Sequence, residues 1–271
     1  MIDSFRNIFQ IPDLRKRVFY TFALLFVYRI GSAIPTPGVD AQALASQFDA
    51  GGSVFGLLDL FAGGNFSNFT IFALGIMPYI SASIILQLLT VVWPYLERIS
   101  KEGEVGRKKI TQWTRYGTVI LSIIQSFGIA IWLENVPGAV ANPGFGFRMM
   151  VILTQTTGTA FIMWLGEQIT ERGIGNGISL IIFAGIVSGL FPALFGIGQD
   201  IFGGGEQWNL INLIVLLAIV VLVVAAIVYV ERAQRRIPIQ YARRVRGRKM
   251  VGGVSTFLPL RVNTGGVIPV I

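Results

Sequence analysis

The chain has 271 residues, of which 53% are hydrophobic and 13% charged, whereas an ordinary soluble domain carries about 25% charged residues. It contains no cysteine and no histidine, which excludes disulfides, thiol nucleophiles, thiolate or imidazole metal sites and imidazole base chemistry. The net charge is +8, so the placement of the basic residues has to distinguish a nucleic-acid-binding surface from membrane topology.

The N-terminus is polar and mixed from Met1 to Arg17, and no small-residue cleavage site follows the first apolar block. A cleavable secretory signal would carry such a site. We therefore expect this block to be the first membrane anchor.

The apolar residues fall in blocks long enough to cross a bilayer, which takes about 20 helical residues. Charged residues or Gly/Pro punctuation bound each block, as expected of helices that satisfy their own backbone hydrogen bonds in lipid. We predict an all-α polytopic membrane protein with six complete spans and a seventh that starts near Asn263. The six run approximately over Val18–Ile34, Thr70–Val92, Trp113–Leu133, Phe147–Leu165, Asn176–Ile197 and Leu210–Val230.

The basic residues gather in every second loop. Twenty of the 22 lie before or within the first span, between spans two and three, or after span six, and Arg148 and Arg172 stand alone. None occurs from Gly31 to Glu97 or from Gly173 to Glu231. Cytoplasmic loops carry an excess of Lys and Arg. The alternation therefore predicts that the N-terminus and the loops near residues 105 and 240 face the cytoplasm.

The segment Ser53–Phe66 is too short to span a membrane, and it contains Gly63-Gly64-Asn65 near its end. Its apolar residues have the spacing of one helix face; they are Val54, Leu57, Leu58 and Phe61. We expect a short helix on the outer side that leads into span two. A re-entrant helix is tolerated where it lines a cavity or packs in protein, and an interfacial helix with no further role is the alternative.

Glycines mark the connection between spans four and five, Gly173-Ile174-Gly175-Asn176-Gly177. The run follows an apolar helical block rather than a strand, which argues against a nucleotide-binding turn and favours a tight cytoplasmic turn. Glu167 and Glu171 lie beside the basic cytoplasmic surface. We expect loop contacts from them rather than acid–base chemistry.

The segment Gln234–Lys249 carries seven basic residues and no acid. A cytoplasmic loop that sets topology explains the charge. The density of charge, with the stiff interruption Ile237-Pro238-Ile239, also fits docking to a phosphate backbone, as on a ribosome, or to an acidic protein. Both interpretations stay open at this point.

The main polar groups inside the spans are Arg29, Gln87, Gln125 and Gln155, and no Asp or Glu lies at mid-span. A secondary transporter, the main alternative to a channel, needs ionisable or ion-coordinating groups near the midplane. A membrane enzyme needs a nucleophile with a base or a metal site. The pattern therefore counts against a coupled transporter and a membrane enzyme, and we expect no enzymatic activity and no cofactor.

Two long stretches are distinctive. Ile71–Leu89 (IFALGIMPYISASIILQLL) closely resembles the second segment of the bacterial SecY family, and Trp164–Gly185 (WLGEQITERGIGNGISLIIFAG) resembles its turn between segments four and five. Arg29–Asp40 and Lys101–Thr118 are also similar to that family. The resemblance implies a helical clamshell of ten transmembrane helices in two pseudo-symmetric halves around an hourglass pore.

On this resemblance, residues 1–197 form the N-terminal half, with segments one to five. Residues 198–271 begin the C-terminal half with segment six, the basic cytoplasmic loop 231–261 and the start of segment seven. The chain stops at Ile271 inside that segment. We therefore expect a fragment that lacks half of the lateral gate.

The resemblance also assigns roles to residues near the pore. Ser53–Phe66 matches the re-entrant plug helix that seals the outer funnel at rest, with plug residues Ser53, Val54, Phe55, Leu57, Leu58, Leu60, Phe61, Gly63 and Gly64. An apolar pore ring, which would resist ion passage by dewetting, is matched by Ile76, Ile80, Ile178, Ile182 and Ile271.

Two further surfaces follow from the resemblance. The lateral gate opens between spans two and three on one side and seven and eight on the other, and its polar residues are matched by Ser81, Gln87, Gln125 and Asn263. The cytoplasmic loop that engages the motor ATPase SecA or the ribosome is matched by Arg235, Arg236, Arg243, Arg244, Arg248 and Lys249.

The resemblance implies a protein-conducting channel of the bacterial inner membrane. Such a channel passes unfolded, signal-peptide-bearing polypeptides across the membrane and releases membrane segments laterally into lipid. SecA or the ribosome would drive passage, and the small subunits SecE and SecG are the expected companions.

Overall fold

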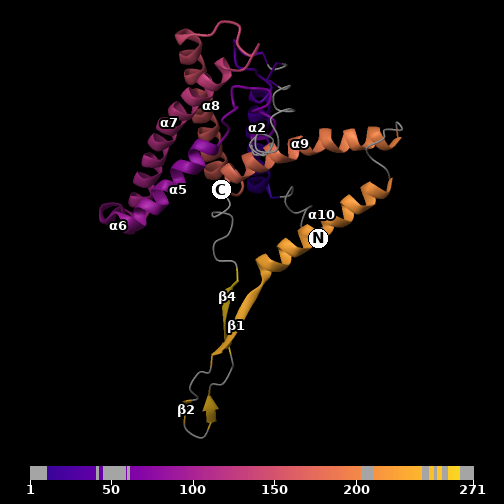
Figure 1. The fold of residues 1–271 in the computed structure, drawn as a ribbon. Helices are drawn as coiled ribbons and strands as arrows, with labels where there is room; N and C mark the ends of the chain where they lie inside the picture. The colour runs from indigo at the N-terminus through magenta and orange to yellow at the C-terminus, as the bar shows by residue number, and fades with distance from the viewer. Residues whose placement is uncertain are drawn as a thin grey trace. The chain divides into compact units, whose positions relative to one another are not determined.

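The computed structural model describes residues 11–40, 43–44, 59, 62–202, 210–239, 244–246, 249–251 and 256–262 (Figure 1). These residues form seven α-helices and four short strands, so the predicted helical class is confirmed. The chain divides into two compact units, Met1–Leu194 and Phe195–Ile271.

The helices follow one another from the N-terminus with few interruptions. They are α2 (Pro12–Gly31), α5 (Met77–Val92), α6 (Pro94–Lys101), α7 (Glu104–Glu134), α8 (Phe145–Arg172), α9 (Gly177–Phe202) and α10 (Leu210–Arg232). In the first unit α7 packs against α5 and α8, and α2 packs against α8 (Figure 1).

Four helices of the described residues, α7 to α10, are long and apolar enough to cross a membrane. A fifth candidate is the pair α5 and α6, which is bent by 100° at its break. The pair breaks at Trp93, whose extended backbone precedes Pro94. Basic residues at both ends, at Arg15–Arg17 and Arg29, interrupt the apolar run of α2.

The helix of span two is shorter than the sequence predicts. The prediction runs over Thr70–Val92, whereas α5 begins only at Met77 and Thr70–Ile76 forms turns. Phe69 and Gly75 have φ angles of +41° and +55°, in the left-handed region that a right-handed helix cannot contain. The first third of the predicted span is therefore non-helical.

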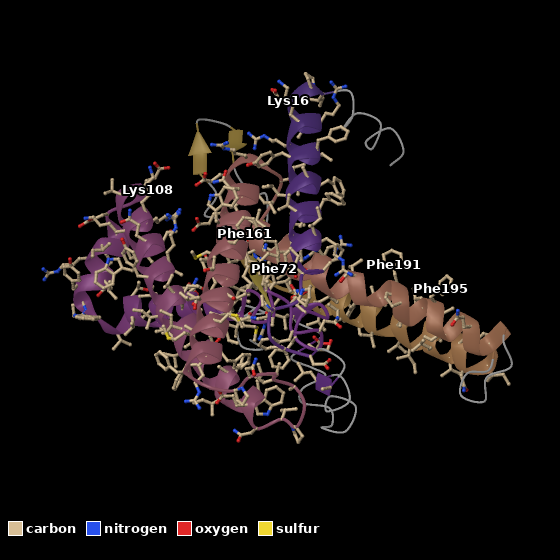
Figure 2. All side chains as sticks on the ribbon, turned by 90° about the horizontal axis from the view of Figure 1, so that it is seen from above. Lys16, Phe72, Lys108, Phe161, Phe191 and Phe195 are labelled. Carbon is tan, nitrogen blue, oxygen red and sulfur yellow. The ribbon has the colours of Figure 1, made fainter. Side chains whose placement is uncertain are left out.

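Two hydrophobic clusters form the core of the first unit, and the non-helical segment contributes to both. Phe69 and Ala73 belong to one cluster with residues of α7 and α8. Phe72 and Ile76 belong to the other, with Tyr28 and residues of α8 and α9. Phe72 stacks between the rings of Tyr28 and Phe161, with centroid separations of 5.8 and 6.1 Å. Phe72 and Phe161 are labelled in Figure 2.

The second unit contains α10 and an antiparallel ribbon that is not predicted from the sequence. Strand β1 (Gln234–Ile239) pairs with β4 (Thr256–Arg261), from Gln234 opposite Arg261 to Ile239 opposite Thr256. Strand β2 (Arg244–Arg246) pairs with β3 (Lys249–Val251). The predicted basic loop is thus built on strands, and Pro238 and Pro259 are tolerated because each strand of a two-stranded ribbon has a free edge.

Candidate functional site

Four of the five predicted pore-ring isoleucines belong to one hydrophobic cluster. Ile76 immediately precedes α5 and Ile80 lies in its first turn, and Ile178 and Ile182 lie at the start of α9. The spacing of four residues places Ile178 and Ile182 on one face of α9. Ile76 is buried, and the other three are half-buried against the same cluster. Ile271 lies outside the described residues.

The turn before α9 is held by protein groups, in agreement with the predicted tight turn. The N–H of Ile174 donates to Thr21 Oγ1 at 3.1 Å, and the N–H of Gly177 donates to Thr170 Oγ1 at 2.9 Å. Asn176 caps the helix, because its Oδ1 accepts the N–H groups of Ile178 and Ser179 at 3.1 and 3.4 Å.

Close backbone approach also fixes the start of α9. A Cβ added at Gly177 would lie 2.0 Å from the carbonyl oxygen of Gly166 on α8. Glu167, one residue further along α8, accepts a hydrogen bond from Arg115 Nε of α7 at 2.7 Å. The partner of Glu167 is thus a helix residue rather than the expected loop, and the contact ties α7 to α8 near the turn.

Only the end of the predicted plug segment lies among the described residues. Gly63 and Gly64 have φ angles of +70° and +81°, and Gly63 packs so closely on α9 that an added Cβ would lie 2.6 Å from Gly185 Cα. Asn65 Nδ2 donates to the Tyr28 hydroxyl of α2 at 3.1 Å. The end of the segment is thus anchored on α2 and α9. The predicted plug residues Ser53, Val54, Phe55, Leu57, Leu58, Leu60 and Phe61 lie outside the described part.

The Asp59 carboxylate organises the same turn. Its Oδ1 accepts the N–H groups of Phe66 and Ser67, both at 3.0 Å, and its carbonyl oxygen accepts the N–H of Gly64 at 3.0 Å. An aspartate in a turn commonly holds the backbone in this way. We therefore regard Asp59 as structural.

The three predicted gate residues that can be placed differ in exposure. Ser81 and Gln125 are half-buried, whereas Gln87 is exposed. Gln125 lines a hollow of about 410 Å³ between the end of the plug segment, the start of α5 and α7, together with Phe66 and Met77. Asn263 lies outside the described residues.

The basic ribbon presents charge on its first strand. Arg235 and Arg236 of β1 are exposed, and the guanidinium carbon of Arg236 lies 4.7 Å from the ring centroid of Phe257 on β4. This cation–π contact holds Arg236 on one face of the ribbon. Arg244 and Lys249 belong to β2 and β3, and Arg243 and Arg248 lie outside the described residues.

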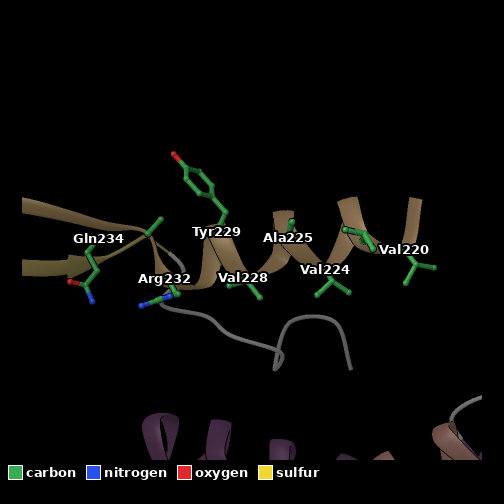
Figure 3. A pocket seen from close by; sticks show the side chains of 9 residues that line it. Val220, Val224, Ala225, Val228, Tyr229, Arg232 and Gln234 are labelled. Atoms are coloured by element: carbon green, nitrogen blue, oxygen red, sulfur yellow. The ribbon is translucent and has the colours of Figure 1, made fainter. Parts of the chain in front are cut away.

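A hollow on the surface of α10 is not a credible ligand site. It measures about 890 Å³ and lies along one side of α10, lined by valines such as Val220, Val224 and Val228 and by Tyr229 (Figure 3). These residues are exposed on an apolar helix long enough to cross a membrane. Such a surface faces lipid. No group of three acidic side chains in the described ranges could hold a metal ion.

Comparison with known proteins decides the family. The family model described as SecY matches residues 70–271. The chain belongs to the SecY family. It is 52% identical over 263 residues to the protein translocase subunit SecY of Buchnera aphidicola, covering 96% of this chain and 73% of that one. It is 53% identical over 265 residues to the subunit of Escherichia coli, covering 96% of this chain and 59% of that one.

Solved structures support the fold. One of them, reported with the finding that the plug domain of SecY stabilises the closed state of the translocation channel, aligns with a TM-score of 0.55. It is 21% identical, and the alignment covers 94% of this chain and 54% of that one. At this identity the likeness supports the SecY-type fold alone.

The sequence did not reveal what holds the segment before Ile76 in place. It shows Gln155 only as a polar group inside a predicted span of this SecY-family chain, whereas the Gln155 amide contacts the non-helical segment before α5. The local sequence carried a partial signal, because Gly75 and Pro78 stand where a continuous helix was predicted. The partner on α8 is 80 or more residues away along the chain and left no local signal.

Proposed function

We propose that this chain is part of a protein-conducting channel of the bacterial inner membrane. The channel passes unfolded secretory polypeptides across the membrane and membrane segments laterally into lipid. Membership of the family supports this proposal, as does the name of its relatives, protein translocase subunit SecY. The chain spans 59 to 73% of those two relatives, so the proposal concerns the longer protein to which it corresponds.

One observation carries the proposal: isoleucines from two separate elements meet in one cluster. Ile76 and Ile80 reach it from α5, and Ile178 and Ile182 reach it from α9. An apolar constriction of branched side chains excludes water and ions but can open around a polypeptide. We assign these four residues, with Ile271, to the pore ring. No bond is made or broken in this function, so no cofactor is assigned.

The surrounding residues take their roles from the same proposal. Ser53–Phe66 is the plug, and its end is anchored through Gly63 on Gly185 of α9 and through Asn65 on Tyr28 of α2. The polar side chains of the lateral gate are Ser81, Gln87, Gln125 and Asn263. Residues 1–197 and 198–271 belong to the two halves of the clamshell.

The basic residues set the orientation of the channel in the membrane and bind the partners that drive translocation. Because Lys and Arg gather in every second loop, the N-terminus and the ribbon are cytoplasmic. The ribbon is the docking surface for SecA or the ribosome, and its exposed Arg235 and Arg236 suit an acidic or phosphate-bearing partner. SecE and SecG complete the complex.

The test is the ion conductance of vesicles that contain the full-length complex. Ile80→Ser and Ile182→Ser hydrate the ring and should raise the resting conductance several-fold. Val221→Ser is the matched control, because Val221 is 67% exposed on the apolar α10. The same rise in the control, or no rise in the ring variants, would remove the support for a sealing ring.

A further inference from the structure

The backbone N–H and C=O groups of the non-helical segment Thr70–Ile76 need hydrogen-bond partners that a helix would otherwise supply. It lies in the apolar part of the chain but lacks the regular hydrogen bonds of a helix, and in lipid every backbone polar group must find a partner within the protein. Its own turns supply two bonds, from Ala73 N–H to Thr70 O at 2.9 Å and from Gly75 N–H to Phe72 O at 2.8 Å. The N–H of Ile71 donates to Ile34 O at 3.0 Å.

The buried amide of Gln155 on α8 supplies further bonds. Gln155 is 1% exposed. Its Oε1 accepts the N–H of Leu74 at 3.4 Å, and its Nε2 donates to the carbonyl oxygen of Thr70 and to Thr36 Oγ1, both at 3.0 Å. Because one backbone partner is a donor and the other an acceptor, only one orientation of the amide satisfies both.

These bonds hold both ends of a five-residue stretch, Thr70 to Leu74. Leu74 is followed two residues later by Ile76, which is the residue that precedes α5. Gly158, almost one turn further along α8, lets the same stretch approach so closely that an added Cβ would lie 2.0 Å from Ile71 O. The position of α8 therefore determines where α5 begins.

We propose that Gln155 is a positioning residue for the pore ring. Its amide fixes the non-helical stretch and with it the depth and direction of Ile76, which has no helical turn before it to hold it in place. The inference rests on the proposed function, because it gives Gln155 a role in the ring rather than in folding alone.

The test uses the full-length channel in membranes, with a photoreactive probe at position 76 or 178 and a precursor arrested in passage. Gln155→Met removes all three hydrogen bonds and keeps a side chain of similar length. We expect the yield of crosslinks from position 76, relative to position 178, to fall at least about fivefold, the factor that corresponds to the loss of just one of the three hydrogen bonds.

Gln168→Met is the matched control on the same helix. Gln168 accepts a hydrogen bond from the Tyr20 hydroxyl at 3.3 Å and has no hydrogen bond to the stretch. It should leave the ratio between the two positions unchanged. A general loss of stability would lower both yields together, whereas a positioning role lowers only the yield at position 76.

A second variant keeps the inference testable if Gln155→Met does not assemble. Gln155→Asn keeps the donor and the acceptor of the amide on a side chain shorter by one methylene and buries no charge, so its ratio should fall by less. A ratio unchanged from the parent in the variant that assembles overturns the positioning role. Absence of crosslinks at both positions in the parent channel would instead overturn the pore ring itself.

Discussion

Replacement of Gly158 by alanine should force α8 away from the segment that it holds. A Cβ at this position would lie 2.0 Å from Ile71 O and 3.3 Å from Phe72 Cδ1, and real Cβ atoms essentially never approach a heavy atom within 3.0 Å. The helix and the segment must therefore separate by about 1 Å. That displacement lengthens the bonds from Gln155, now 3.0 and 3.4 Å, beyond hydrogen-bonding range.

The free energy of this change follows from three contributions. Overpacking of a close contact costs about 2 kcal/mol. Two unmade buried hydrogen bonds cost about 1 kcal/mol each. Alanine in a helix interior is favoured over glycine by about 1 kcal/mol. The free energy of unfolding should therefore fall by roughly 3 kcal/mol.

The assay is thermal unfolding of the purified full-length complex in detergent. Gly128→Ala on α7 is the matched control, because no atom lies within 4 Å of the Cβ that it would add. Helix propensity alone should leave its Tm unchanged or slightly higher, whereas Gly158→Ala should lower Tm by several degrees. A Tm for Gly158→Ala equal to or above that of the parent would refute the packing argument.

Three further predictions concern other parts of the site. Deletion of Ser53–Phe66 should leave the complex assembled but raise its resting ion conductance; an unchanged conductance would speak against a plug. Arg236→Glu should weaken binding of SecA or the ribosome several-fold without inverting the membrane topology, and the opposite pattern in binding and topology assays would favour a loop that serves topology alone. Asn176→Ala removes the cap that accepts the N–H of Ile178, so it should cost about 1 kcal/mol, measured as a lower Tm; an unchanged Tm would contradict the capping role.

The long helices could be predicted because each is an apolar block. The block Leu210–Val230 became α10 almost without change, since a helix in lipid must satisfy its own backbone. Helix ends were predicted less well. The span Trp113–Leu133 belongs to α7, which begins at Glu104 because the charged residues before the apolar block still favour helix. Hydropathy marks where the bilayer lies, not where the helix starts.

The break before α5 could not be predicted because its partner is distant in sequence. A continuous helix over Thr70–Val92 satisfies the hydropathy pattern. The non-helical backbone that forms instead is satisfied partly by its own turns and partly by distant groups, among them the amide of Gln155. The ring isoleucines were assigned by family resemblance. Their meeting depends on the close approach at Gly177, which no local pattern reports.

The ribbon was missed for a different reason. Its outer pair joins Gln234 to Arg261, so the pairing is not local, and the many charged residues mask the alternation of a strand. One signal was available. Gly247-Arg248 stands between the paired residues Arg246 and Lys249, and a two-residue connection that begins with glycine is typical of a hairpin.

Crosslinking of a translocating precursor is the most direct test of the central claim, that the isoleucine cluster lines a protein-conducting pore. In the full-length channel, photoreactive probes at positions 76, 80, 178 and 182 are compared with probes at the exposed positions 221 and 224 of α10. We expect an arrested secretory precursor to crosslink to the four ring positions and not to the two on α10. Crosslinks confined to α10, or absent from the ring while the precursor is engaged, would contradict the claim.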